Sequence, residues 1–337
     1  MASFVRTQEV EHSIGADGEF QLRLTSGDVE LRAVEGDTAR VRIEFDIRAG
    51  SEADADAIHE GARFRVRADD GALHLSEPDG ESLGMDSVAR LLHVGRTTVR
   101  VNVSAELPST ARIGFQGDSA DAVATGFTGT QQYRTVSGDL VLNAVGGDVR
   151  VRGVSGDVSL RADEPIRLEA NTVSGDLSAF APRFETLRAV TVSGDVELEG
   201  ERAEGVDHRI ETVSGDLTLG AVGGLDLEVR GLSSDVAVAL EHRSEGSRDR
   251  RRYIVGDGSA RLLFSSMSGD AAVGSARRVA ALPPSPPPPT NAPPPAGTPS
   301  PLDADEQLRI LRALERGEID VDEAARRLAA DGAGSGA

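Results

Sequence analysis

The sequence lacks cysteine and lysine, has no tryptophan, and holds only two tyrosines among its 337 residues. The absence of cysteine excludes disulfides, thiolate metal sites and cysteine nucleophiles. The absence of lysine leaves no lysine base or electrophile and no lysine-bearing phosphate loop. Aromatic residues make up 3 % of the chain, so any core must be built from small aliphatic side chains, which suit thin, regularly stacked layers.

The charge of the chain is one-sided, with 56 acidic residues against 36 basic ones and a formal net charge of −20. A surface this acidic repels phosphate backbones and anionic lipid, so we expect no nucleic-acid partner. No apolar run is long enough for a signal peptide or for the roughly 20 residues of a membrane span. The sequence therefore predicts a cytoplasmic protein without a membrane span.

What the chain does contain is the tripeptide Ser-Gly-Asp at a nearly fixed spacing. Copies start at residues 137, 155, 174, 193 and 214, and a degenerate Ser-Ser-Asp follows at 233. Each unit has a strand that ends in Thr-Val, then the corner, then a strand of apolar-x-apolar form. A pitch near 20 residues indicates one small unit stacked on copies of itself. The side chains predicted to face inward are Leu140, Leu142, Val158, Leu160, Leu177, Ala179, Val196, Leu198, Leu217, Leu219, Val236 and Val238.

The Ser-Gly-Asp corner has a backbone explanation. Glycine permits a positive φ, and the Ser and Asp side chains can accept backbone N–H bonds that a turn leaves open. In stacked coils the corner carboxylates would form a column with a spacing of about 4.8 Å. We expect them to cap the backbone, and the alternative is a calcium site, because hard cations take carboxylate oxygens. The column would consist of Asp139, Asp157, Asp176, Asp195, Asp216 and Asp235.

Composition divides the chain into four regions. Residues 1–115 alternate irregularly and predict a β-rich region that begins the solenoid, with a short helix capped by Ser51 and Asp54. Residues 116–281 carry the regular repeat. Residues 282–301 hold eleven of the fifteen prolines and predict a disordered, polyproline-like linker. Residues 302–331 change character again and predict a small helical hairpin.

This hairpin is predicted to be an interaction module. About 30 residues are too few to be stable alone, so we expect it to associate with itself or to dock on a protein partner. Its nine acidic residues outnumber its five arginines, which is wrong for a DNA-reading helix. The apolar positions expected at the interface are Leu308, Leu311, Leu314, Val321 and Leu328.

Between residues 233 and 268 the pitch rises to 35 residues. We interpret the extra residues as an insertion that protrudes from one coil. They include an arginine cluster at 248–252, which could contact an acidic partner or a phosphate. The alternative is a solvated loop whose charge is balanced by Glu241, Glu245 and Asp249.

Nothing in the sequence indicates catalysis or a bound cofactor. The six histidines are scattered without metal-ligand spacing, and no nucleophile elbow or zinc-protease motif is present. Polysaccharide lyases also use β-helices, but they need a charged catalytic set in a cleft, and sugar-binding surfaces usually offer aromatic platforms. We therefore expect a protein that is not an enzyme and carries no cofactor and no metal.

The Thr-Val-Ser-Gly-Asp corners, preceded by the strand from Val99 to Pro108, resemble the bacterial DUF4097 family of adhesin-like β-strand repeats. The segment from Leu311 to Ala324 resembles the short SHOCT-like helical module that often accompanies this family. The resemblance implies an all-β, right-handed parallel β-solenoid, no enzymatic activity, and an association with bacterial envelope stress. We expect a non-enzymatic scaffold with a repeat surface; the alternative is an exported adhesin-like protein that binds glycan or calcium through its solenoid face.

Overall fold

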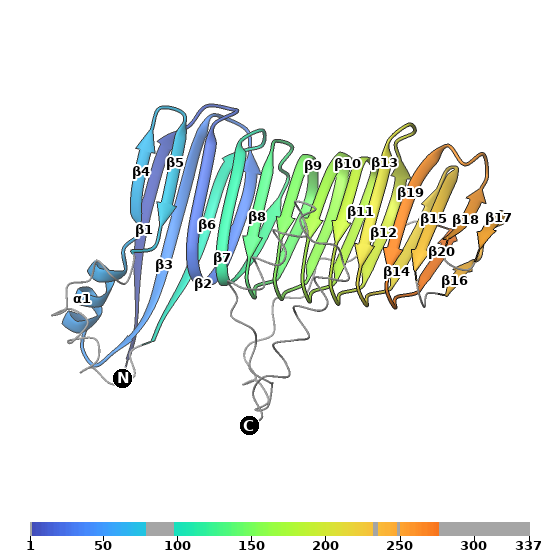
Figure 1. Ribbon diagram of the computed structural model, residues 1–337. Coiled ribbons are helices and arrows are strands. Elements are labelled where there is room, and N and C mark those ends of the chain that lie inside the picture. The colour runs from blue at the N-terminus through green and yellow to red at the C-terminus, as the bar shows by residue number, and fades with distance from the viewer. Residues whose placement is uncertain (1, 79–97, 232–234, 248–249, 276–337) are drawn as a thin grey trace, which may run out of the picture.

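A computed structural model describes residues 2–78, 98–231, 235–247 and 250–275 of the chain. Its strands form a β-solenoid in which successive coils lie side by side along one axis (Figure 1). This confirms the all-β solenoid that the corner spacing predicts. The predicted linker at 282–301 and the helical hairpin at 302–331 lie outside the described residues, and both stay predictions.

The elements follow one another from the N-terminal end of the stack to its C-terminal end. The first group comprises β1 (Ala2–Ser13), β2 (Glu19–Val34), β3 (Thr38–Ala49), α1 (Glu52–Ala62), β4 (Arg65–Asp69), β5 (Ala72–Ser76) and β6 (Thr98–Pro108). The middle group comprises β7 (Arg112–Thr125), β8 (Gln131–Thr135), β9 (Leu140–Arg152), β10 (Val158–Asn171), β11 (Leu177–Val190), β12 (Val196–Arg202), β13 (Asp207–Thr212) and β14 (Leu217–Val222). The last group comprises β15 (Leu225–Gly231), β16 (Val236–Val238), β17 (His242–Ser247), β18 (Arg250–Val255), β19 (Ala260–Ser266) and β20 (Ala271–Ser275).

Each coil has two walls with a core between them. A long strand such as β10 runs along one wall to Arg161, passes a bulge, and continues along the other wall from Ile166. Wall 1 has the strand order β1, β3, β6, β2, β7, β9, β10, β11, β12, β14, β20, β16. Wall 2 has the order β4, β5, β2, β7, β8, β9, β10, β11, β13, β19, β15, β18, β17.

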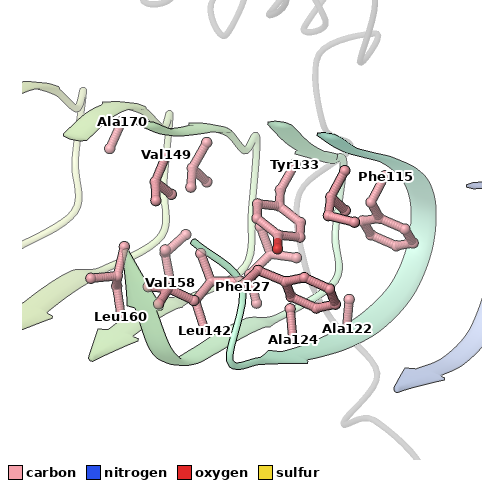
Figure 2. Close-up of a cluster of buried hydrophobic side chains, with 14 of the residues drawn as sticks. Phe115, Ala122, Ala124, Phe127, Tyr133, Leu142, Val149, Val158, Leu160 and Ala170 are labelled. Carbon is pink, nitrogen blue, oxygen red and sulfur yellow. The ribbon is translucent and has the colours of Figure 1, made fainter. Parts of the chain in front are cut away.

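Alternate residues of both walls point into the core, as the period of two requires. Figure 2 shows Leu142, Val158 and Leu160 facing Val149 and Ala170 across the interior. Ten of the twelve side chains predicted to face inward are at most 2 % exposed. The remaining two, Val236 and Val238, are half-buried because β16 is the last strand of wall 1.

The N-terminal end departs from parallel stacking. In wall 1, β3 pairs antiparallel with both β1 and β6, and in wall 2 β4 pairs antiparallel with β5. The helix α1 lies at this end of the stack (Figure 1). Its N-terminus is capped by Ser51, whose Oγ accepts the N–H of Asp54 at 3.2 Å, as predicted. Gln8 of β1 binds the chain two residues after the helix, where its side-chain amide makes hydrogen bonds of 2.9 and 3.0 Å with the backbone of Phe64.

The C-terminal end corrects the predicted insertion. The residues between the two distant corners do not protrude from a coil: β18 pairs antiparallel with β15, and β17 pairs with β18, so the hairpin extends wall 2. The chain then turns back, and β19 lies between β13 and β15 (Figure 1). In wall 1, β20 likewise lies between β14 and β16. The last coil in sequence is therefore an inner coil in space.

Candidate binding surfaces

At the corner edge of the solenoid, each position of the Thr-Val-Ser-Gly-Asp motif makes its own kind of contact. At three corners the Thr Oγ1 accepts the glycine N–H three residues on: Thr135 for Gly138 at 2.9 Å, Thr191 for Gly194 at 3.1 Å and Thr212 for Gly215 at 2.8 Å. The valines of successive corners form a small apolar column in which Val154 is 3 % and Val173 is 7 % exposed. The corners are thus fixed both within a coil and between coils.

The serine and glycine of the motif do something other than predicted. Serine hydroxyls donate to the valine carbonyl of the preceding coil, as Ser155 does to Val136 at 3.2 Å, whereas we expected them to accept. Most corner glycines do not have the positive φ that was their expected purpose. Instead, stacked glycines approach so closely that a Cβ on Gly175 would collide with the carbonyl oxygen of Gly156. Close packing of corners, and not turn conformation, is why glycine stands there.

The aspartates form the column that the spacing predicts, and it caps the backbone between coils. An Oδ1 of each accepts the N–H of the aspartate in the next coil: Asp139 that of Asp157 at 2.9 Å, Asp157 that of Asp176 at 3.0 Å, Asp176 that of Asp195 at 2.9 Å, and Asp195 that of Asp216 at 2.9 Å. The column then passes through Asp270 before Asp235, both at 2.8 Å, because the last coil is inserted there.

Calcium binding along this column stays a prediction. One oxygen of each carboxylate is engaged by an amide of the next coil, which is the capping role that we expected. Within the described part of the chain, no group of three or more His, Asp or Glu side chains is arranged to hold a metal ion. The corner column is therefore best described as the device that keeps the coils in register.

The outer faces of the two walls differ in character. Along the middle of wall 1, the pairing register lines up small or uncharged side chains: Val123, Val141, Ser159 and Ser178. The outer face of wall 2 is rich in arginine, even though the chain as a whole carries a net charge of −20. Two grooves are open on this face, one near each end of the stack.

The groove near the N-terminal end, here called the arginine groove, has a volume of about 500 Å³. Four arginines, one histidine and three glutamines line it, and none of its described lining residues is acidic. Arg67 lies 3.2 Å from Asp69, and His74 lies 4.0 Å from Glu19. Its charged and amide side chains are Arg23, Arg65, Arg67, Arg134, His74, Gln21, Gln116 and Gln132.

The groove near the C-terminal end has a volume of about 850 Å³ and is lined by six arginines and four carboxylates, several of them in ion pairs. Arg252 makes a bidentate ion pair with Asp226, with both distances 2.6 Å, and Arg250 pairs with Glu228 at 2.7 Å. The hydrogen bond from Arg250, together with that from Arg230, lowers the pKa of Glu228. Residues 250–252 of the predicted arginine cluster lie on β18, where Arg250 and Arg252 form ion pairs with β15. Arg252 also stands opposite Glu245 of β17, one of the three acids expected to balance the cluster.

Two basic side chains are buried in the core of the C-terminal third. Arg202 is 2 % exposed, and its Nε, Nη1 and Nη2 have no hydrogen-bond partner among the described residues. Burial lowers the pKa of its guanidinium from 12.5 to about 10. His208 is fully buried, with Nε2 3.1 Å from the carbonyl oxygen of Ala203, and burial lowers its pKa as well. Sequence reasoning missed Arg202, although Val196, Leu198, Gly200 and Arg202 continue one inward alternation.

Sequence reasoning also missed the arginine groove. Alternation does place Arg23, Arg65 and Arg134 on outward positions of their strands, because their neighbours Leu22 and Tyr133 are buried. However, the three strands are far apart in sequence, and only their pairing order in wall 2 brings them to one face. The predicted interaction residues Leu308, Leu311, Leu314, Val321 and Leu328 lie outside the described residues, so they stay a prediction.

Comparison with known proteins identifies similar sequences and folds. The sequence model of the family described as Toastrack DUF4097 matches residues 10–188, more than half of the chain. No curated protein matches. A structure from Parabacteroides distasonis described as a "putative lipid binding protein" is 13 % identical, with a TM-score of 0.43, over 79 % of this chain and 96 % of its own. A "putative adhesin" from Bacteroides fragilis is 12 % identical, with a TM-score of 0.36, over 80 % of this chain and 97 % of its own.

The described part of the chain offers no helix with the length and apolar character of a membrane span. Its solvent-facing surfaces include the corner edge, the outer face of wall 1, which holds a groove of about 580 Å³ near the N-terminal end, and the arginine-rich outer face of wall 2. The first is occupied by hydrogen bonds between coils, and the C-terminal groove of wall 2 is occupied by its own ion pairs. The arginine groove is lined by four arginines, and no carboxylate stands among its described lining residues.

Proposed function

Because the chain belongs to the Toastrack DUF4097 family, we propose that it is a non-enzymatic interaction protein that presents the outer face of its solenoid to a partner. The observation that carries this proposal is the corner column, which fixes each coil on the next through side-chain and backbone hydrogen bonds. A rigid stack of this kind holds outward side chains at a regular spacing over many strands, which is the property of an extended binding surface.

We further propose that residues 302–331 act as a second contact module, for oligomerisation or for docking on a protein. Leu308, Leu311 and Leu314 support this proposal because they recur at helical spacing in a segment too short to be stable alone. The resemblance of this segment to the SHOCT-like module supports it too. An association with bacterial envelope stress and a location in the cytoplasm belong to the same proposal.

The arginine groove favours a second candidate function, the binding of a glycan through the solenoid face by an exported protein. A row of arginines and amides is suited to acidic groups and hydroxyls. Cell fractionation separates the two candidates, because the first places the protein in the cytoplasm and the second places it outside. The corner carboxylates give less support to calcium as the ligand, since one oxygen of each accepts a backbone N–H of the next coil.

The proposal is tested by measuring the mass and the partners of two chains, the full chain and residues 1–301. We expect the full chain to be larger than a monomer by light scattering, or to retain a protein that residues 1–301 lose. A matched variant of the full chain with Leu311→Asp and Leu314→Asp should behave as residues 1–301 do. If the full chain is a monomer that retains no protein and no polymer, the proposed interaction function is wrong.

A further inference from the structure

Each end of the solenoid has one strand that extends beyond the opposite wall. Counted outward from β2, which belongs to both walls, wall 1 continues with β6, β3 and β1, whereas wall 2 continues with β5 and β4. Counted outward from β11, wall 1 continues with β12, β14, β20 and β16, whereas wall 2 continues with β13, β19, β15, β18 and β17. Within the described part of the chain, β1 and β17 therefore have no strand of the other wall opposite their inner faces.

At the N-terminal end a helix covers the inner face of the extra strand. Gln8 of β1 points inward and is 7 % exposed. Arg6, on the same face, forms ion pairs with Glu52 and Asp56 of α1 at 3.3 and 2.7 Å. Ala55 of α1 is fully buried in the core. The helix thus closes the core at this end of the stack (Figure 1).

At the C-terminal end the corresponding face is exposed. The inward positions of β17 lie in register, through β18, with buried residues of β15. These positions are His242, Ser244 and Gly246, and all three are exposed. Opposite them, β16 ends wall 1 with Val236 and Val238 half-buried, whereas the matching positions of the inner coils are at most 3 % exposed. These five residues define an open end of the core, here called the open end.

We propose that residues 302–331 of a second copy of this chain close the open end, as α1 closes the other end. This inference rests on the proposed function, since it names the docking site of the segment that serves there as a contact module. Leu308, Leu311 and Leu314 recur at helical spacing and supply the apolar stripe that a helix needs to pack on half-buried valines.

The chain outside the described residues begins close to the open end. The last described strand, β20, pairs with β16 and so lies one strand from the edge of wall 1. Residues 276–301 then connect β20 to the terminal segment. Their proline-rich part, 282–301, has a reach of about 60 Å as a polyproline helix. The connection is therefore long enough to carry the segment to the end of a neighbouring molecule.

The proline content of this connection favours exchange between two copies over docking on the same chain. Docking within one chain requires the two ends of the connection to lie about two strand spacings, or about 10 Å, apart. A semi-rigid connection with eleven prolines holds its ends farther apart, which lowers the effective concentration for an internal contact. Two copies that exchange their segments close both open ends at once in a two-fold dimer.

Cross-linking of the full chain tests this contact, because the natural sequence contains no cysteine. A chain with Ser244→Cys and a chain with Leu311→Cys are co-expressed and treated with a short bismaleimide. We expect a product of twice 35.3 kDa that contains both chains. The matched control uses Glu245→Cys in place of Ser244→Cys. Because neighbouring residues of a strand point to opposite faces, this control should lose most of the product.

Two outcomes of the cross-linking would overturn the inference. An equal yield of the double-mass product from the Leu311→Cys chain alone would show that two terminal segments meet each other and not the open end. A chain that carries both Ser244→Cys and Leu311→Cys, and that links only internally, would place the segment on its own solenoid.

The affinity of the dimer gives a second measurement, by light scattering on dilution. Val238→Asp should raise the dissociation constant about tenfold or more, because a charge replaces an apolar contact at the open end. The matched control, Val123→Asp, changes a valine that is 38 % exposed on the outer face of wall 1 and should leave the constant within about twofold. A dimer that is insensitive to Val238→Asp, or equally sensitive to both substitutions, would refute the open end as the docking site.

The outcome also separates this inference from the proposed function. A full chain that stays monomeric, yet retains a protein through residues 302–331, loses only the inference of exchange between copies. A full chain that does neither, and retains no polymer, loses the proposed function as well.

Discussion

Replacing the buried Arg202 by methionine should make the protein more stable. The guanidinium is 2 % exposed and none of its three nitrogen atoms has a partner among the described residues. A buried charge without a partner is costly because it loses its hydration and gains nothing in return. Methionine keeps most of the length of the side chain and removes the charge, so the substitution separates the electrostatic cost from the packing.

The pKa of Arg202 gives the size of the expected effect. A pKa lowered from 12.5 to about 10 corresponds to about 3 kcal/mol of destabilisation of the charged form in the folded state. Because the folded pKa lies below the unfolded value, stability rises with pH only between those two values. At pH 7 the whole penalty is present, and the methionine variant should be more stable by about 1–3 kcal/mol after the smaller side chain is allowed for.

Urea unfolding at pH 7, followed by circular dichroism, measures this change. The urea concentration at the unfolding midpoint should rise. The slope of the unfolding free energy against urea concentration should stay constant, which shows that the surface exposed on unfolding is unchanged. The control is Arg209→Met on the next strand, where an ion pair with Glu211 leaves the guanidinium half exposed; it should change stability by less than about 1 kcal/mol. A loss of stability in the Arg202 variant alone would refute the reasoning, because it would mean that the guanidinium has a favourable partner.

Three further predictions concern the corners and the second buried base. Gly175→Ala should destabilise the solenoid by about 3 kcal/mol because its Cβ meets the carbonyl of the preceding coil, whereas Gly274→Ala, with open space around it, should be nearly neutral in urea unfolding. Asp176→Ala should cost about 1 kcal/mol by leaving the N–H of Asp195 without its acceptor, and Asp176→Asn should recover most of this loss in thermal unfolding; equal losses would contradict a capping role. His208 has a pKa below its ordinary value of 6.5, so the folded state resists protonation, and stability should fall as the pH drops below 6.5. The variant His208→Leu, which introduces the residue type of its pairing partner Leu262, should lose this dependence of the urea midpoint on pH. An unchanged dependence of the midpoint on pH would show that another group causes it.

The sequence predicts the repeating part of the fold because a single coil contains all the information needed to stack it. The corner motif supplies its own capping groups, and the alternation around Leu140 and Leu142 places them in the core, where both are fully buried. The column of corner aspartates follows from the same pitch, including the hydrogen bond that the N–H of Asp195 donates to Oδ1 of Asp176. Each of these features depends only on neighbours one coil away.

The sequence does not predict features that depend on which distant strands become neighbours. The residues of β17 and β18 carry no local signal that β18 pairs with β15 and β17 with β18. The arginine groove has the same origin, since Arg65, Arg23 and Arg134 meet only through the order of β4, β2 and β8 in wall 2. Their alternation shows that they face outward, and it does not show that they face outward together.

The inward place of β19 and β20 has a consequence for how the molecule is made. A ribosome releases residues 225–255 before residues 260–275, yet the later segment lies between β13 and β15 and between β14 and β16. The strands made earlier must therefore leave room between β13 and β15 and between β14 and β16, or separate again, until β19 and β20 have been made. A polypeptide that stops before residue 260 therefore lacks two inner strands of the stack, β19 and β20, and not merely its outermost ones.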